Sequence, residues 1–263
     1  MSKISPLAII EDGAKIGDNV TIAPYCHISS QSVIGDNTII EQGACIYGKT
    51  TIGKANKIYS YAILGSEPQD LKFHGEDVEL IIGDNNMIRE FTLINPGTEG
   101  GGSKTIIGNN NLIMGHVHLA HDVILHDNIV LVNSSIIAGH VEIFDNVVVG
   151  GMSAIHQFVK IGENAMIGGA SAVSQDIPPY CLAEGNRAVI RGLNLVGLRR
   201  KIARENIDPL KSAYKKMFMS GNPMQDVAKE INQNTDNPYV NNLTTFVLQT
   251  TRGIPVKREN KEE

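Results

Sequence analysis

The stretch that decides the fold runs from Ile107 to Val173 and reads IGNNNLIMGHVHLAHDVILHDNIVLVNSSIIAGHVEIFDNVVVGGMSAIHQFVKIGENAMIGGASAV. From Ile107 onward, every sixth residue is a branched aliphatic one. A helix repeats every 3.6 residues and a simple strand alternates every two, so neither gives a strict period of six. A hexapeptide period is typical of a parallel β-helix. Three hexapeptides close one triangular coil, and residues eighteen apart should therefore stack in neighbouring coils.

The same period extends toward the N-terminus. It begins at Ile4, runs to Leu64, and resumes over Ile82, Ile88 and Ile94. The residue two positions before each marker shares its strand face, so both should point inward. Glycines also recur every eighteen residues near one corner, where a turn can require a positive backbone φ; they are Gly17, Gly35 and Gly53.

Two interruptions break this ladder, at about residues 65–80 and 95–104. The first places Asp70 and Glu76 where inward aliphatic side chains should be, and the second is rich in glycine. We interpret both as loops that leave the wall of the coil, since long loops in a regular scaffold are often functional.

The period ends after Val173, and Asp176-Ile177-Pro178-Pro179-Tyr180 breaks the pattern. From about Arg191 the apolar spacing becomes helical, and about four short helices are expected. Asp208-Pro209 and Asn237-Pro238 are predicted helix starts. The predicted organisation is thus a β-helical domain over residues 1–177 and a small helical domain over residues 178–263.

Composition fits one ordinary globular chain. It has 263 residues, 42% of them hydrophobic and 19% charged, with a net charge of −5. The mild acidity argues against a nucleic-acid binder. Three scattered cysteines favour reduced thiols over a disulfide framework. With no signal-peptide core and no membrane-length apolar run, we expect a cytoplasmic protein without a transmembrane segment.

Stacking gathers polar side chains on one edge of the coil. His121 should lie under Gly139 and Gly139 under Gln157, while Asp122 should lie under His140. His118 is close in sequence, and His156 belongs to the same edge one coil beyond His140.

This edge offers the parts of an acyl-transfer site. An imidazole is the usual general base near neutral pH, and a neighbouring carboxylate orients it. The unobstructed amide of Gly139 could stabilise an oxyanion beside His121. The cysteines lie elsewhere, so direct transfer fits better than a covalent intermediate.

Three other interpretations remain open at this point. The histidines could merely decorate turns. They could also bind zinc in a lyase, with His121 and His126 five residues apart, although zinc needs three converging ligands. A purely structural β-helix would, however, show a monotonous outer face.

Two surface features suggest partners. Outward residues stack into an apolar stripe, which is typical of a partner surface and predicts a homo-oligomer; the stripe is Leu112, Val130, Val148 and Met166. A basic group early in the helical part is either a solvated face or a site for phosphate or an acidic protein. Its members are Arg187, Arg191, Arg199, Arg200, Lys201 and Arg204.

Several long strings resemble the UDP-N-acetylglucosamine acyltransferase family of lipid A synthesis. They include Gln69-Asp70-Leu71-Lys72, His118-Leu119-Ala120-His121-Asp122, Ala138-Gly139-His140, residues 150–158, and Gly185-Asn186. The resemblance covers nearly the whole chain. It implies a left-handed β-helix with a helical C-terminal domain, assembled as a homotrimer, that moves an (R)-3-hydroxyacyl group from acyl carrier protein to the sugar's 3-position. No cofactor and no metal are implied.

The resemblance also implies residue roles. His121 matches the general base, Asp122 its orienting acid and Gly139 the oxyanion donor. Gly169 matches the position that limits acyl length. Positions matching substrate contacts are Gln69, Asp70, Lys72, His118, His140, His156, Gln157, Asn194 and Arg200. The carrier protein would meet Arg187, Arg191, Arg199 and Arg204.

The chain departs from the family pattern in places. Val196 stands where an acid is expected, Arg199-Arg200-Lys201-Ile202 replaces a more usual Lys-Arg-Arg-Gly, and His116 stands in the turn associated with hydroxyl acceptors. We hypothesise that His116 marks preference for a 3-amino sugar. The sister N-acyltransferase of the pathway and a short-chain O-acetyltransferase are the alternatives; the sister enzyme usually carries an extra N-terminal domain, for which a ladder that begins at Ile4 leaves no room.

Overall fold

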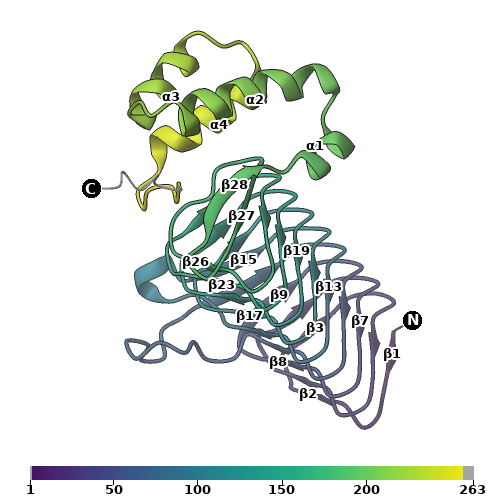
Figure 1. Ribbon diagram of the computed structural model, residues 1–263. Helices are drawn as coiled ribbons and strands as arrows, with labels where there is room; N and C mark the ends of the chain where they lie inside the picture. Colours follow the sequence, from purple (N-terminus) through teal and green to yellow (C-terminus); the bar gives the residue numbers. More distant parts are fainter. Residues whose placement is uncertain (1, 257–263) are drawn as a thin grey trace.

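The chain winds into a triangular parallel coil with a helical cap at its C-terminal end (Figure 1). This is a computed structural model, and it describes residues 2–256. The helical domain is predicted to extend to residue 263, but residues 257–263 lie outside the described residues. The predicted division into two domains at residue 177 stays a prediction.

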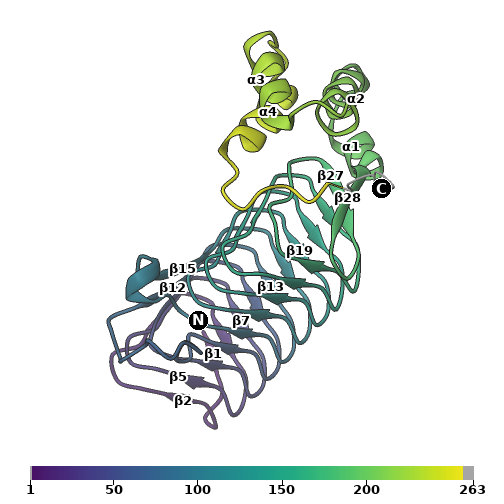
Figure 2. The same cartoon turned by 60° about the vertical axis from the view of Figure 1, so that its left-hand side comes forward.

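Three parallel sheets form the three walls of the coil (Figure 2). In spatial order, the first sheet is β1 (Lys3–Ile4), β4 (Thr21–Ile22), β7 (Ile39–Ile40), β10 (Lys57–Ile58), β13 (Met87–Ile88), β16 (Leu112–Ile113), β19 (Val130–Leu131), β22 (Val148–Val149), β25 (Met166–Ile167), β27 (Cys181–Glu184) and β28 (Val189–Leu193). The second is β2 (Ile9–Ile10), β5 (His27–Ile28), β8 (Cys45–Ile46), β11 (Ile63–Leu64), β14 (Leu93–Ile94), β17 (His118–Leu119), β20 (Ile136–Ile137), β23 (Ala154–Ile155) and β26 (Ala172–Val173). The third, in chain order, is β3 (Lys15–Ile16), β6 (Val33–Ile34), β9 (Lys49–Ile52), β12 (Glu79–Ile82), β15 (Lys104–Ile107), β18 (Ile124–Leu125), β21 (Glu142–Ile143) and β24 (Lys160–Ile161).

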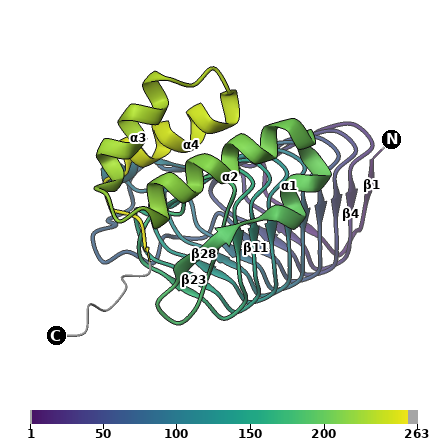
Figure 3. The same cartoon turned by 45° about the horizontal axis from the view of Figure 1, so that its top comes forward.

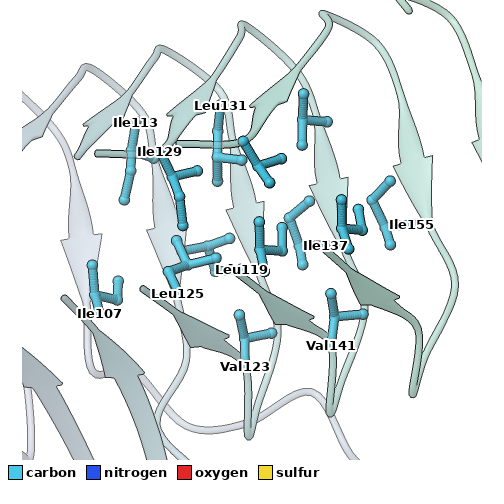
Figure 4. Close-up of a cluster of buried hydrophobic side chains, with 14 of the residues drawn as sticks. Ile107, Ile113, Leu119, Val123, Leu125, Ile129, Leu131, Ile137, Val141 and Ile155 are labelled. Carbon is cyan, nitrogen blue, oxygen red and sulfur yellow. The ribbon is translucent and has the colours of Figure 1, made fainter. Parts of the chain in front are cut away.

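The register confirms the eighteen-residue stacking. Ile113 pairs with Leu131 in the first sheet, and Leu119 pairs with Ile137 in the second. The marker side chains from Ile22 to Val173 are all buried, and Figure 4 shows those between Ile107 and Ile155 filling the interior of successive coils. Ile4 is 45% exposed, because the first described coil has a neighbour on one side only.

The three corners of the coil carry different features. We call them the first corner (between the first and second sheets), the second corner (between the second and third) and the third corner (between the third and first). Both interruptions leave at the second corner. Residues 65–78 connect β11 to β12, and residues 95–103 connect β14 to β15 and contain the short 3-10 helix Glu99–Gly101.

The expected positive φ at the corner glycines is wrong. At the third corner, the residues with positive φ lie two positions after these glycines and are Asn19, Asn37 and Ala55. Glycine is needed there for close approach instead, because a Cβ on Gly35 would lie 2.5 Å from the carbonyl carbon of Gly53 in the next coil.

Up to residue 256, the cap contains four helices, as expected, and Figure 3 shows them from above. They are α1 (Leu195–Lys201), α2 (Arg204–Met219), α3 (Met224–Gln233) and α4 (Pro238–Gln249). Asn237 caps α4 as predicted, accepting hydrogen bonds from the amides of Tyr239 and Val240.

Two predictions about this part are wrong. A helix is predicted from about Arg191, but residues 191–193 still belong to β28, an antiparallel partner of β27, and α1 begins only at Leu195, because β27 pairs with β25 and extends the first sheet. Asp208-Pro209 does not start a helix, since α2 begins at Arg204 and contains Pro209. Pro209 has no backbone N–H, but it does not break α2. It lies near the start of the helix, so only one carbonyl of the first turn loses its helical hydrogen bond.

Candidate active site

The histidine cluster lies at the second corner, where both loops leave. Successive turns of this corner are residues 120–122, 138–140, 156–158 and 174–176, each eighteen residues after the last. Loop 95–103 occupies the same corner one coil before residues 120–122, and loop 65–78 one coil earlier still. The fold thus places the irregular segments directly beside the predicted polar edge.

His121 and Asp122 form a hydrogen-bonded pair. Nδ1 of His121 lies 2.8 Å from Oδ2 of Asp122, and the Asp122 side chain is 1% exposed. A carboxylate can only accept, so Nδ1 carries the proton and Nε2 keeps its lone pair. His121 is therefore held in the tautomer that a general base requires.

Loop 95–103 holds the carboxylate from its other side. Thr98 donates its amide to Oδ1 of Asp122 at 2.8 Å and its hydroxyl to Oδ2 at 2.6 Å. The amide of Asp122 itself donates to Oγ1 of Thr105. These donors stabilise a buried negative charge that would otherwise be costly. Sequence reasoning missed Thr98, because an irregular loop has no register from which its contacts can be read.

Gly139 lies directly against the His121 ring. A Cβ at this position would be 2.6 Å from Cε1 and 2.8 Å from Nε2 of His121. Within residues 2–256 no acceptor pairs with the Gly139 amide, although the neighbouring amide of His140 donates to the His121 carbonyl. A free backbone donor therefore lies beside the free nitrogen of the imidazole, as the stacking predicted.

His140 and His118 surround this pair. The His140 ring stands edge-on to that of His121 at 5.1 Å, and its Nδ1 is 3.8 Å from Oδ2 of Asp122. Burial lowers the pKa of His140, while the charges of Asp122 and Asp70 oppose that shift. Burial likewise lowers the pKa of His118, partly offset by its contact with the Leu93 carbonyl.

The first loop carries three of the predicted substrate contacts. The charge of Asp70 opposes the lowering of the pKa of His140, and Oδ1 of Asp70 accepts from the Lys72 amide at 3.0 Å. Gln69 and Lys72 are exposed on the same loop. A cavity of about 1140 Å³ lies against this loop, lined by Tyr47, Lys49 and residues 73–78 among others, but it does not include His121.

The remaining predicted residues lie at all three corners of the coil. His156 and Gln157 occupy the second corner one coil beyond His140, and Gly169 is exposed at the first corner. Asn194 caps α1 and donates to the Asn164 carbonyl at the third corner. Arg200 lies in the last turn of α1, next to Lys201, which bonds Asn146 at that third corner. The chain therefore does not bring Asn194 and Arg200 to the corner that holds His121.

The basic group is exposed along the cap. Arg187 lies in the turn between β27 and β28, Arg191 pairs with Glu184 at 3.4 Å, and Arg199 and Arg204 line a cavity of about 460 Å³ with Lys211. Within residues 2–256, no helix has the length and hydropathy needed to cross a membrane.

One side-chain group could accept a metal ion. In the part of the chain described, ligand atoms of His121, Asp122 and His140 lie within 4.8 Å of one another. His126 is not among them, because it pairs with Glu142 at 3.2 Å and stacks on Phe144 at the third corner. Both oxygens of Asp122 already accept hydrogen bonds.

Known proteins resemble the chain over its whole length. Residues 176–255 match the family model described as UDP-N-acetylglucosamine O-acyltransferase, domain 2. The acyl-(acyl-carrier-protein)–UDP-N-acetylglucosamine O-acyltransferase of Sulfurimonas denitrificans is 65% identical, covering 99% of this chain and all of the relative. That of Helicobacter pylori is 44% identical, covering 98% of this chain and 96% of the relative. The solved UDP-N-acetylglucosamine acyltransferase of Campylobacter jejuni has a TM-score of 0.94 at 49% identity, covering 97% of this chain and all of that one.

Proposed function

The chain belongs to the acyl-(acyl-carrier-protein)–UDP-N-acetylglucosamine O-acyltransferase family, and we infer that it performs the first step of lipid A biosynthesis with His121 as its general base. It transfers an acyl group from acyl carrier protein to UDP-N-acetylglucosamine. The observation that carries the assignment of roles is the arrangement at the second corner: a buried Asp122 fixes His121 with Nε2 unprotonated, beside the free amide of Gly139.

The proposed reaction is a direct transfer. Nε2 of His121 takes the proton of the sugar's 3-hydroxyl as its oxygen attacks the thioester carbonyl carbon. The Gly139 amide donates to the resulting oxyanion. When the tetrahedral intermediate collapses, the C–S bond breaks and the proton passes from His121 to the departing thiolate. Asp122 stays ionised throughout and stabilises the transient imidazolium.

The donor is proposed to be an (R)-3-hydroxyacyl chain. Asp70 has a carboxylate suited to accept a hydrogen bond from the 3-hydroxyl of the acyl group. Gln69, Lys72, His118, His140, His156 and Gln157 are the proposed contacts to the two substrates. Gly169 is the proposed limit on acyl length.

We propose that the active unit is a homotrimer and that each site draws on two subunits. Asn194 and Arg200, the proposed contacts to the nucleotide and its phosphate, lie over the third corner, whereas His121 lies at the second. One substrate could meet both only if the third corner of a neighbouring subunit faced the second corner of this one. The half-buried stripe of Leu112, Val130, Val148 and Met166, which the strand register stacks as predicted, offers an apolar contact surface.

The carrier protein is proposed to bind the cap. Arg187, Arg191, Arg199 and Arg204 are all exposed, in a chain that is acidic as a whole. Complementary charge would speed the encounter with an acidic carrier and make its rate depend on salt. The cavity lined by Arg199, Arg204 and Lys211 offers a point at which an acidic side chain could dock.

The acceptor's 3-substituent is a separate proposal. His116 has a positive φ at the first corner and stacks on Phe91 at 5.0 Å. It therefore lies on a different corner from His121, and its proposed effect on a 3-amino acceptor would act across a subunit interface.

Product mass spectrometry tests the function. Purified protein would receive a series of (R)-3-hydroxyacyl carrier proteins with an equal mixture of UDP-N-acetylglucosamine and its 3-amino analogue. An acylated nucleotide sugar is expected, and its mass reports chain length and acceptor together. Preference for the hydroxyl acceptor would count against the His116 hypothesis, and no product with any donor would overturn the proposed function.

Zinc-dependent chemistry is a second candidate, supported only by the grouping of His121, Asp122 and His140. A metal at Nδ1 of His121 would displace the proton donated to Asp122, so it would compete with the base arrangement. Two measurements separate the candidates. Elemental analysis shows whether the active protein contains zinc, and activity that is retained after exhaustive chelation excludes a catalytic metal.

A further inference from the structure

The C-terminal segment after α4 returns to the second corner and lies across its last turn. Residues 250–256, which we call the strap, contact residues 174–176, the turn that follows 156–158 in the stack. The amide of Asp176 donates to the Gly253 carbonyl at 2.9 Å, and its carboxylate accepts from the Thr250 hydroxyl. Gln175 donates its side-chain amide to the Arg252 carbonyl at 3.2 Å. The strap thus occupies the place of one more coil.

This anchoring fixes the direction of the Arg252 side chain. Its Nε donates to the Ser174 carbonyl at 3.2 Å, and its Nη2 lies 3.4 Å from Nδ1 of His156. The guanidinium therefore spans the turn at 174–176 and reaches the turn below it. His156 and Arg252 are 96 residues apart in sequence, so only the returning strap brings them together.

Two contacts compete for Nδ1 of His156. The Gln157 carbonyl lies 3.2 Å away and could only accept a proton from Nδ1. The guanidinium is always protonated and could only donate to an unprotonated Nδ1. One nitrogen cannot satisfy both, so the dominant contact decides the tautomer of the ring.

We infer that Arg252 is a positioning residue that fixes His156 as the neutral tautomer with its proton on Nε2. The contact to the guanidinium is charge-assisted and is therefore the stronger of the two. Nε2 has no partner within residues 2–256 and belongs to an exposed side chain. His156 then presents a hydrogen-bond donor to solvent at the same corner as His121, suited to an acceptor oxygen of a bound substrate.

The consequence for the reaction rests on the proposed function. Without the guanidinium, Nδ1–H turns to the Gln157 carbonyl and Nε2 becomes an acceptor, which repels the oxygen it formerly bound. Arg252→Met should therefore raise KM for one of the two substrates about tenfold, the ordinary effect of one lost polar contact, with kcat changed less than threefold. Arg252→Lys keeps a cationic donor and should restore most of the affinity.

The decisive measurement is the tautomer itself, read from long-range 15N–1H spectra of histidine-labelled protein. The His156 signals are assigned with His156→Gln. We expect the Nε2–H form in the parent and in Arg252→Lys, and the Nδ1–H form in Arg252→Met. Thr250→Val is the matched control, because it removes an anchor of the strap and keeps the guanidinium; it should retain the parent tautomer.

Two results would overturn the inference: Nδ1–H in the parent protein, or the same tautomer in the parent and Arg252→Met. If KM rose equally in Thr250→Val and Arg252→Met while the spectra stayed unchanged, Arg252 would only hold the strap in place. That result would also overturn the inference. The spectra are recorded without any catalysed reaction. A failure of this inference can therefore be distinguished from a failure of the proposed acyl transfer.

Discussion

Thr98 binds both oxygens of the Asp122 carboxylate, through its amide at 2.8 Å and its hydroxyl at 2.6 Å. A loop that interrupts the hexapeptide ladder therefore orients the carboxylate that in turn orients His121. The regular coil determines where the imidazole of His121 lies, and the irregular loop determines how the Asp122 carboxylate is oriented toward it. This division explains why an interruption of the ladder occurs one coil before the proposed base.

Thr98→Val should lower kcat and leave the fold intact. The change removes the hydroxyl donor but keeps the amide donor and nearly the same volume. Hydrogen bonds to charged groups contribute about 1.5–3 kcal/mol, so we expect a loss of about tenfold in kcat. Steady-state kinetics measures it, with Thr105→Val as a control that removes the hydroxyl contacting the Asp122 amide. An unchanged kcat in Thr98→Val would show that the amide alone orients the carboxylate.

His121→Ala should abolish most of the activity, by at least about a hundredfold, because the change removes the unprotonated nitrogen that lies beside Gly139. Asp122→Asn should be nearly as severe. Its amide can donate to Nδ1, which would move the imidazole proton to Nε2 and remove the base. Rates from single-turnover assays measure both, with melting temperatures to confirm folding. Substantial activity in Asp122→Asn would contradict the assigned tautomer.

Gly139→Ala should lower kcat strongly, since the added Cβ would meet the His121 ring at 2.6 Å and force it away from the Gly139 amide, the proposed oxyanion donor. Gly115→Ala is the matched control. Both glycines precede a left-handed turn residue, but the nearest atom to a Cβ at residue 115 is 3.2 Å away and belongs to Asn133. The two variants should have similar melting temperatures and differ by about tenfold or more in kcat.

The sequence predicted the regular part of the site and not the irregular part. The eighteen-residue register placed His121 under Gly139 and Asp122 under His140, because hydrogen bonding between coils leaves no freedom of register. Thr98 and Arg252 could not be predicted, since each belongs to a segment without a period.

Two predictions from local sequence patterns are wrong because tertiary contacts determine the structure at those positions. The apolar spacing predicts a helix from about Arg191, but residues 191–193 pair with β27, whose edge would otherwise be open. Pro209 resembles a helix start but lies inside α2, because the apolar face of Ile207, Leu210, Ala213 and Met217 packs continuously on the core.

Stability should fall as pH drops from about 7 toward 5, in part through His118. Burial lowers the pKa of His118 in the folded state below its unfolded value of about 6.5. Above 6.5 the group is neutral in both states and has no effect. Below it the unfolded chain binds the proton first, so the free energy of unfolding falls as pH drops, and this loss levels off once pH is below the lower folded pKa. Denaturant unfolding at fixed protein concentration should show a weaker pH dependence in His118→Gln than in the parent.

Cys26 and Cys181 should be unreactive in the folded protein. Burial raises the pKa of the Cys26 and Cys181 thiols, and the thiolate is the reactive form. Iodoacetamide at pH 7.5 should modify neither residue in the folded protein and should leave activity intact, while both should react in urea. Mass spectrometry counts the adducts. Loss of activity that parallels the modification of one cysteine would contradict direct transfer.

Gly169→Met should shorten the preferred acyl chain. Gly169 is exposed, and a Cβ there would lie 3.4 Å from the Gly151 carbonyl, an ordinary contact, so a larger side chain can be accommodated without distorting the coil. If the end of the acyl chain reaches this position, the methionine takes its place. Each buried methylene contributes about 0.8 kcal/mol, so excluding two of them should lower kcat/KM for the longest donors about tenfold. Donors shorter by those methylenes should keep their parent rates. Competition among a series of acyl carrier proteins, read by product mass, measures the shift; an equal loss for all chain lengths would mean that Gly169 serves the turn and not the acyl chain.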